Sequence, residues 1–234
     1  MTLVVGTNVS SLAAQKSLAS SSRDMQTAME RLSSGKRINS ASDDAAGLAI
    51  GKDLESRVSG LNQAVRNVND GISMVQIVEG AYDEVTTIVQ RMRDLAVQAA
   101  NESVTSTERA YLDSEQAKLV TALDSVMAQA KFGNVDLATG SAVNVVIHSG
   151  AEASDTITLA MTTTTNDDAD ALGIDASDVD LTSTAGATSA IGDLDTALNT
   201  IATQRATLGA QQTQLESVVR NLANVAENTA AAAG

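Results

Sequence analysis

The clearest pattern in the chain is a heptad repeat of apolar residues within about 44–100. Its members are spaced alternately by four and three residues, which places them along one side of a long α-helix. The seam begins with Leu54, Val58, Leu61, Val65, Val68, Ile72 and Val75. After an inserted step of three residues it resumes as Val78, Tyr82, Val85, Val89, Met92, Ala96 and Ala99. We predict one helix, with a seam of roughly 70 Å that is overwound at the inserted step.

A second repeat lies in a helix predicted over about 189–230. It is formed by Ile191, Leu194, Leu198, Ile201, Arg205, Leu208, Gln212, Leu215, Val219, Leu222 and Ala226. Arg205 and Gln212 are polar members, which weaken the packing of a seam but fix its register. Each buried Leu, Ile or Val contributes about 1.5–3 kcal/mol, so neither seam can remain in water. We therefore predict that helices at about 44–100, 108–131 and 189–230 pack together.

The first 33 residues carry a narrower apolar stripe on an otherwise polar helix. Its members are Val5, Val9, Leu12, Leu18, Met25, Met29 and Leu32. This pattern is typical of a coiled-coil strand, and Gly35 is expected to end the helix in a left-handed cap. A connector should follow, with Asp43 or Asp44 as the N-cap of the next helix. The stripe has no obvious partner within the chain, so we expect residues 1–33 to be mobile or paired with another molecule.

The middle of the chain, about 134–188, changes character. Apolar residues alternate with other residues in two runs, which are separated by the sequence SGAEASD and predict a β-hairpin. The runs are Val143, Val145 and Ile147, then Ile157, Leu159 and Met161. Threonines and aspartates follow and predict an exposed acidic loop. The predicted fold class is mainly α, an elongated antiparallel helical bundle or coiled-coil rod with a small β-hairpin region.

Composition supports long helices and excludes several functions. The chain has no Pro, Cys or Trp, and one Pro inside a helix would cost about 3 kcal/mol. The net charge is −14, and residues 132–200 hold eleven Asp or Glu and no Lys or Arg. That balance argues against nucleic acid as a partner. No apolar run is long enough for a membrane span, and the N-terminus does not resemble a secretory signal peptide. Those two features alone would predict a cytoplasmic protein.

Candidate chemistry is sparse. His148 is the only histidine, and one histidine supports neither a catalytic triad nor a metal site. The acidic cluster does not match the calcium-loop pattern, so we interpret it as a solvated loop. It comprises Asp167, Asp168, Asp170, Asp175, Asp178 and Asp180. We expect no cofactor, no metal and no enzymatic activity, because no nucleophile, base and orienting group come together.

Several long sequence blocks resemble bacterial flagellins, in the order in which that family carries them. The first is MERLSSGKRINSASDDAAGLAIG at 29–51. Two more follow, GLNQAVRNVNDGISMVQIVEGA at 60–81 and QRMRDLAVQAAN at 90–101. FGNVDL at 132–137 and LGAQQTQLESVVRNLANVAEN at 208–228 complete the set. The chain is identified as similar to a minimal flagellin that has the stem but no outer domains.

The resemblance implies an extracellular structural subunit of the flagellar filament, which self-assembles for motility. It reverses the cytoplasmic prediction, because flagellins leave the cell unfolded through the flagellar export channel. It implies a filament-core segment with its connector at 1–43 and a stem domain at 44–234. Other flagellin subunits, an export chaperone and the filament cap are the implied partners. The alternatives are a surface adhesin or ligand module and the hook–filament junction protein, over which RINSASDDAAGLAI and QRMRDLAVQAAN favour flagellin.

Two departures from the family pattern qualify this expectation. The family continues past the block ending at Asn228 into a further helix, which pairs with the N-terminal one, so we expect the chain as given not to polymerise. The resemblance also implies recognition by the flagellin-sensing Toll-like receptor. The matching contacts are Gln90, Arg91, Leu95 and Gln98. However, Lys118 stands where sensed flagellins usually have Glu, and Thr213-Gln214 where they usually have Asn-Arg.

Overall fold

The computed structural model describes residues 8–138, 144–161, 169, 172–175 and 179–233. The order of elements is α1 (Val9–Ser34), α2 (Ala45–Ala99), α3 (Ser106–Gln129), β1 (Lys131–Phe132), β2 (Val135–Asp136), β3 (Asn144–His148), β4 (Thr156–Ala160) and α4 (Thr184–Ala233). The mainly α fold class with a small β-hairpin region is confirmed. Among these helices, none is both long enough and apolar enough to span a bilayer.

The chain forms two compact units. The first comprises Met1–Ser59 with Ala226–Gly234, and the second comprises Gly60–Val225. The second unit contains most of α2 and α4 together with α3 and the strands. The predicted segment boundary after residue 43 falls inside the first unit.

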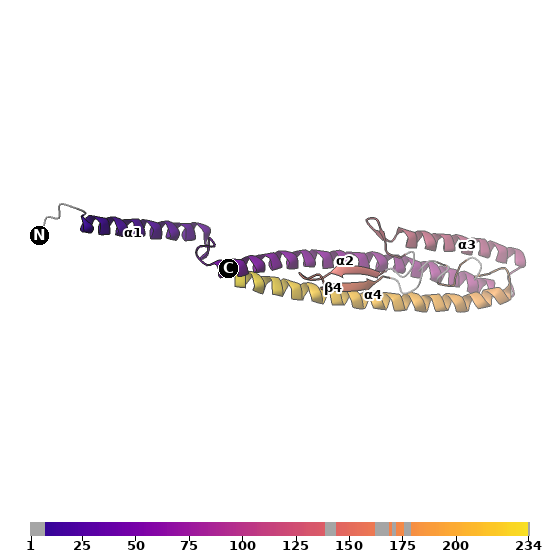
Figure 1. The fold of residues 1–234 in the computed structure, drawn as a ribbon. Coiled ribbons are helices and arrows are strands. Elements are labelled where there is room, and N and C mark those ends of the chain that lie inside the picture. The colour runs from indigo at the N-terminus through magenta and orange to yellow at the C-terminus, as the bar shows by residue number, and fades with distance from the viewer. Residues whose placement is uncertain (1–7, 139–143, 162–168, 170–171, 176–178, 234) are drawn as a thin grey trace. The chain divides into compact units, whose positions relative to one another are not determined.

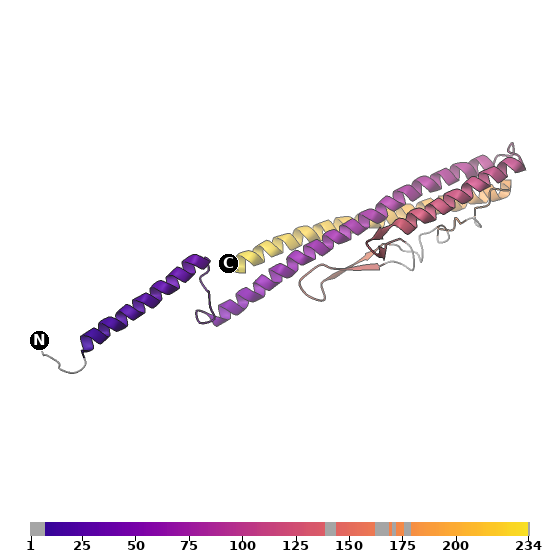
Figure 2. The ribbon, with the colours of Figure 1, turned by 90° about the horizontal axis from the view of Figure 1, so that it is seen from above.

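Within the second unit, α2 and α4 run antiparallel and side by side (Figures 1 and 2). Two ion pairs define their alignment. Arg93 Nε lies 2.7 Å from Asp195 Oδ1, and Arg205 Nη1 lies 3.1 Å from Asp83 Oδ1. A step of ten residues back along α2 thus corresponds to ten residues forward along α4. The predicted antiparallel packing of the two seams is therefore present in this unit.

The buried stripe of α2 is unbroken, so the predicted overwinding step is wrong. One row of buried residues repeats every seven positions as Leu61, Val68, Val75, Tyr82, Val89 and Ala96. The second row is Ala64, Gly71, Val78, Val85, Met92 and Ala99. Sequence analysis placed the bulkier neighbours Val65 and Ile72 in this row, but both are only half-buried. The small residues Ala64 and Gly71 occupy the inward positions and keep the heptad period continuous.

In α4, too, one buried row is displaced by one residue from the row predicted from the sequence. Its main row is buried as Leu194, Ile201, Leu208, Leu215 and Leu222. The second row is Ala190, Ala197 and Gln204, rather than the predicted Ile191, Leu198 and Arg205. Gln204 is therefore the buried polar residue of this seam. Arg205 and Gln212 are half-buried and bind Asp83 and Glu216 respectively.

α3 returns along α2 and is held by defined polar contacts. A capping box starts it, since Thr105 Oγ1 accepts from Glu108 N while Glu108 Oε2 accepts from Thr105 N at 2.8 Å. Arg109 Nε donates to the carbonyl oxygen of Ala99, the last residue of α2, at 2.8 Å. Asp113 Oδ1 accepts from Leu181 N at 3.2 Å. These bonds join α3 to the end of α2 and to the segment just before α4.

The predicted hairpin is β3 paired antiparallel with β4, with Ile147 opposite Ile157 and Val145 opposite Leu159. Its inner face is partly or fully buried, whereas Val146 on the outer face is 55 % exposed. Val143 of the predicted first run lies outside the described residues, as do Asp167, Asp168, Asp170 and Asp178 of the acidic cluster. The short β1–β2 pair was not predicted. It turns at Gly133, whose φ of 62° favours glycine.

Two glycines of α2 should respond oppositely to a side chain. A Cβ at Gly80 would have no neighbour within 4 Å, whereas one at Gly71 would lie 3.3 Å from both Ile147 and Leu159. Gly80→Ala should raise the free energy of unfolding by roughly 0.5–1 kcal/mol through helix propensity. Gly71→Leu should lower it by about 1–3 kcal/mol through overpacking. Urea unfolding followed by circular dichroism measures both, and equal effects would contradict this packing.

Candidate functional site

α1 presents an apolar stripe to solvent along its whole length. No residue of α1 is buried. The exposed fractions are 73 % for Val9, 52 % for Leu12, 75 % for Leu18, 62 % for Met25, 64 % for Met29 and 83 % for Leu32. We call these six residues the α1 stripe; Val5, which was predicted to belong with them, lies outside the described residues. An amphipathic helix normally buries such a stripe, so its exposure marks an interaction surface.

The α1 helix has well-formed ends. Asn8 is its N-cap, with Oδ1 accepting from Ser11 N at 3.1 Å. The predicted C-cap is also present, because Gly35 adopts a φ of 68° and its N–H donates to the Arg31 carbonyl at 2.9 Å. Both caps satisfy backbone groups that helix ends otherwise leave without a partner. α1 is thus a defined helix although none of its side chains is packed in a core.

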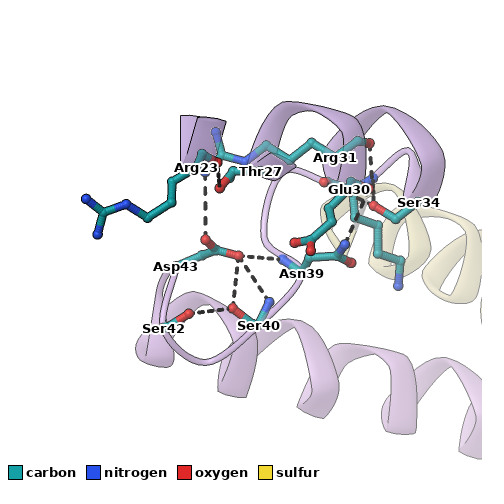
Figure 3. A network of polar contacts seen from close by, with 10 residues as sticks. Arg23, Thr27, Glu30, Arg31, Ser34, Asn39, Ser40, Ser42 and Asp43 are labelled. Carbon is teal, nitrogen blue, oxygen red and sulfur yellow. Dashed lines mark hydrogen bonds and ion pairs between the residues drawn. The ribbon is translucent and has the colours of Figure 1, made fainter. Parts of the chain in front are cut away.

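A polar network joins the end of α1 to the connector (Figure 3). Asp43 Oδ2 accepts from the backbone N–H groups of Asn39 and Ser40 at 3.2 and 3.1 Å. The Asn39 side chain donates to the carbonyl oxygen of Glu30 in the last turns of α1, at 3.4 Å. Arg31 Nη2 lies 4.0 Å from Asp43 Oδ1. The connector is therefore a folded turn rather than an extended tether.

The two adjacent aspartates have separate structural roles, one in the connector and one at the start of α2. Asp43 organises the connector, and the backbone N–H groups of Asn39 and Ser40 lower the pKa of its carboxyl below 3.8. Asp44 is the N-cap of α2, since its Oδ1 accepts from Gly47 N at 2.9 Å. Sequence analysis left the choice between them open. A cap and an Asx-type turn need one carboxylate each, which explains the pair.

A third carboxylate links the connector to the first turns of α2. Glu55 accepts from Lys36 Nζ at 2.7 Å and from Lys52 Nζ at 2.6 Å. The hydrogen bond from Lys36 is the main cause that lowers the pKa of Glu55 to about 2, followed by that from Lys52. A shallow cavity of about 340 Å³ lies beside them, with Ile38 and Ala233 in its lining. The described residues hold no cluster of metal-binding side chains, and nothing in this network suggests catalysis.

The predicted core residues of the stem are all at least half-buried. Leu61, Val68, Val75, Leu194, Ile201, Leu208, Leu215 and Leu222 are buried. Leu54, Val58, Val65, Ile72 and Leu198 are half-buried. The first group lies in the interior of the second unit.

The four predicted receptor contacts on α2 do not share one face. Gln90, Arg91 and Gln98 are exposed, and Arg91 Nη2 lies 2.6 Å from Glu115 Oε1 on α3. Leu95 is only 1 % exposed, so its side chain is part of the core of the free subunit. Its role as a direct receptor contact stays a prediction.

The positions at which the chain departs from the family pattern are also exposed. They are Lys118 on α3 and Thr213 and Gln214 on α4. Glu115 was not identified from the sequence, because it lies 24 residues from Arg91 and no local pattern connects the two. Only the pairing of α2 with α3 brings these charges together.

The connector network predicts a specific pH dependence. Because folding lowers the pKa of Asp43, its contribution is fully present above about pH 3.8 and is lost as the pH falls through the lower folded pKa. The amide NMR shifts of Asn39 and Ser40 should therefore titrate together with a midpoint below 3.8. Asp43→Asn should change both shifts at neutral pH, and Asp53→Asn, an exposed control, should not. Unchanged Asn39 and Ser40 signals in Asp43→Asn would contradict the network.

Comparison with known sequence families gives two matches in chain order. Residues 5–142 match the bacterial flagellin N-terminal helical region, and residues 191–234 match the C-terminal helical region. A flagellin of Halalkalibacterium halodurans is 38 % identical, covering 98 % of this chain and 84 % of that protein. The flagellar filament 33 kDa core protein of Treponema phagedenis is 37 % identical with the same coverage. Flagellin A of Vibrio anguillarum is 45 % identical over 72 % of this chain, but only 44 % of that protein is covered.

Solved structures give the same picture. The crystal structure of Bacillus cereus flagellin matches with a TM-score of 0.58 at 30 % identity, covering 72 % of this chain and 94 % of that one. A putative flagellar hook-associated protein from Vibrio parahaemolyticus matches with a TM-score of 0.69 at 16 % identity, covering 83 % and 99 %. The second likeness shows a common fold alone. The sequence matches, by contrast, extend over nearly the whole chain, and they show that this chain belongs to the bacterial flagellin family, a family of structural proteins rather than enzymes.

Proposed function

We propose that this flagellin acts as a structural subunit of the extracellular flagellar filament, joined to its neighbours through the α1 stripe. The observation that carries the proposal is the contrast between its helices. α2 and α4 bury their apolar rows, whereas every member of the α1 stripe is more than half exposed. The partner that best fits this surface is another subunit of the same kind, because relatives of this chain are named as filament proteins.

The chemistry of α1 suits close packing against other helices. Between its apolar positions lie mainly Ser, Ala and Gln, whose small or flexible side chains let a second helix approach. Residues 8–34 carry three basic and two acidic side chains, so copies can approach without strong repulsion. The acidic charge of the chain lies instead in the second unit. As in the family, an export chaperone and the filament cap are further proposed partners.

A pair of substitutions in the α1 stripe tests this function. Leu12→Ser with Met29→Ser should abolish filaments on cells that depend on this gene for flagellin, because each change removes apolar area that a neighbour would cover. Electron microscopy of the cells counts the filaments, while circular dichroism of the purified protein reports its helix content. Ser20→Ala with Ser21→Ala changes residues of the same helix outside the stripe and should leave filaments intact. Normal filaments with the stripe variant would contradict the proposal.

We infer, as a second function, that the exposed face of α2 around Arg91 is a ligand for the flagellin-sensing Toll-like receptor. The supporting observation is that Gln90, Arg91 and Gln98 are all accessible, and that Glu115 holds the Arg91 guanidinium in place with bonds of 3.1 and 2.6 Å from Nε and Nη2. Leu95 supports this face from below. Lys118, on the exposed side of α3, weakens recognition where other flagellins have an acidic residue.

Receptor signalling in reporter cells tests the expected contributions of Arg91 and Lys118 to recognition. Arg91→Ala should lower potency by about tenfold or more, since a central Arg contact is worth at least about 1.4 kcal/mol. Lys118→Glu should raise potency, whereas Asn62→Ala, an exposed control elsewhere on α2, should change nothing. If Arg91→Ala kept full potency while its helix content was unchanged, this second function would be refuted.

A further inference from the structure

Some backbone N–H and C=O groups of the β3–β4 hairpin face away from the partner strand. Ser149 N donates to Asp155 O at 2.8 Å, next to the pair of His148 with Thr156. In an antiparallel ladder, bonded and non-bonded pairs alternate. The backbone groups of His148 and of Ala160 therefore face outward, on opposite edges and at opposite ends of the hairpin.

A side chain from α4 occupies one of these outward positions. The Gln211 amide, in the orientation that satisfies both of its groups, donates to Ala160 O at 3.3 Å and accepts from Ala160 N at 3.1 Å. Two bonds to one residue, one donated and one accepted, are what a neighbouring antiparallel strand would supply. Gln211 thus stands in for the next strand and ties the end of β4 to α4.

A side chain from α2 holds the opposite edge. Asn67 Nδ2 donates to His148 O at 3.3 Å. The Asn67 amide is itself oriented, because its Oδ1 accepts from Gln63 Nε2 at 2.9 Å, and Arg66 in turn donates to Gln63 Oε1. The hairpin is therefore hydrogen-bonded to a side-chain amide of each long helix, once by Asn67 of α2 and twice by Gln211 of α4.

The apolar face of the hairpin packs into a notch in α2 at Gly71, which we call the Gly71 notch. At Gly71 the absence of a side chain admits Ile147 and Leu159, which would lie 3.3 Å from a Cβ there. One heptad further along the same row, Val78 fills the equivalent place. Sliding the hairpin by one heptad toward Val78 would consequently drive it into a β-branched side chain.

The two long helices need such a fixed point. Their buried rows repeat every seven residues, so after a shift by one heptad apolar rows would still face each other, although Tyr82, Met92 and Gln204 would meet new neighbours. The ion pairs Arg93–Asp195 and Asp83–Arg205 involve side chains that are 35–70 % exposed, and exposed pairs contribute little. Apolar burial sets the faces of α2 and α4 but leaves their axial register weakly defined.

We propose that the β3–β4 hairpin locks the axial register of α2 against α4, with Asn67 and Gln211 as the two positioning residues. The hairpin is hydrogen-bonded to both helices at once. Neither helix can therefore slide along the other without breaking a side-chain amide hydrogen bond or moving Ile147 and Leu159 out of the Gly71 notch. This role concerns the subunit itself and does not depend on what the filament surface binds.

The test measures register directly by pulsed electron spin resonance. The chain has no cysteine, and Gly80 and Gly209, whose numbering places them across from each other, both have open space for a side chain. Spin labels on Gly80→Cys and Gly209→Cys should give one narrow distance distribution. Adding Asn67→Leu and Gln211→Leu should broaden it or add a population displaced by about 10 Å along the axis, the length of one heptad.

Hydrogen exchange at the Ala160 amide reports the hairpin bond separately. The double variant should lose about tenfold of its protection, as expected for one net hydrogen bond. Asn62→Leu with Gln214→Leu, exposed residues of the same types on the same helices, should change neither readout. If the double variant loses helix content, Gln211→Glu serves instead, because it keeps the acceptor for Ala160 N and removes only the donor to Ala160 O. An unchanged narrow distance distribution in a folded variant, whether the double variant or Gln211→Glu, would overturn the proposal even if Ala160 lost protection.

Discussion

The structure depends on one constraint: long rows of apolar side chains spaced by heptads must be covered. Within the second unit, α2 and α4 cover each other with α3 and the hairpin beside them. Tyr82, Val85 and Leu208 show the result, since each is fully buried. α1 carries the same kind of row, but among the described residues its members are exposed. The division between self-covered and uncovered rows separates what folds within one chain from what needs another chain.

Polar groups in this protein fix positions rather than supply cohesion. Asp43 and Glu55 hold the connector in a defined turn, Glu115 holds Arg91, and Asn67 and Gln211 hold the hairpin. Most of these contacts are exposed to solvent, where each contributes little free energy. These contacts instead fix the positions of segments within the subunit. Such precision matters in a filament, because a small displacement within the subunit is repeated in every copy.

Sequence analysis predicted the helices and their antiparallel packing well, because heptad spacing and glycine caps are local signals. Gly35 ended α1 as expected. The sequence could not show which of two neighbouring residues faces inward. Val65 and Ile72 were chosen over Ala64 and Gly71 because larger side chains bury more area, but Ile147 and Leu159 of the hairpin, some 80 residues away, occupy the space beside Gly71. The burial of Leu95 could not be predicted for a related reason, since only tertiary packing shows that it is covered.

Hydrogen exchange of the α1 amides can be measured in the free subunit and in filaments taken from cells that depend on this gene for flagellin. If neighbouring subunits cover the α1 stripe, exchange along Val9–Ser34 should be rapid in the free subunit and strongly slowed in the filament. The amides of the bundle around Tyr82 and Leu208 should be protected in both states. Strong protection of α1 in the free subunit, or rapid exchange of α1 in the filament, would contradict the account.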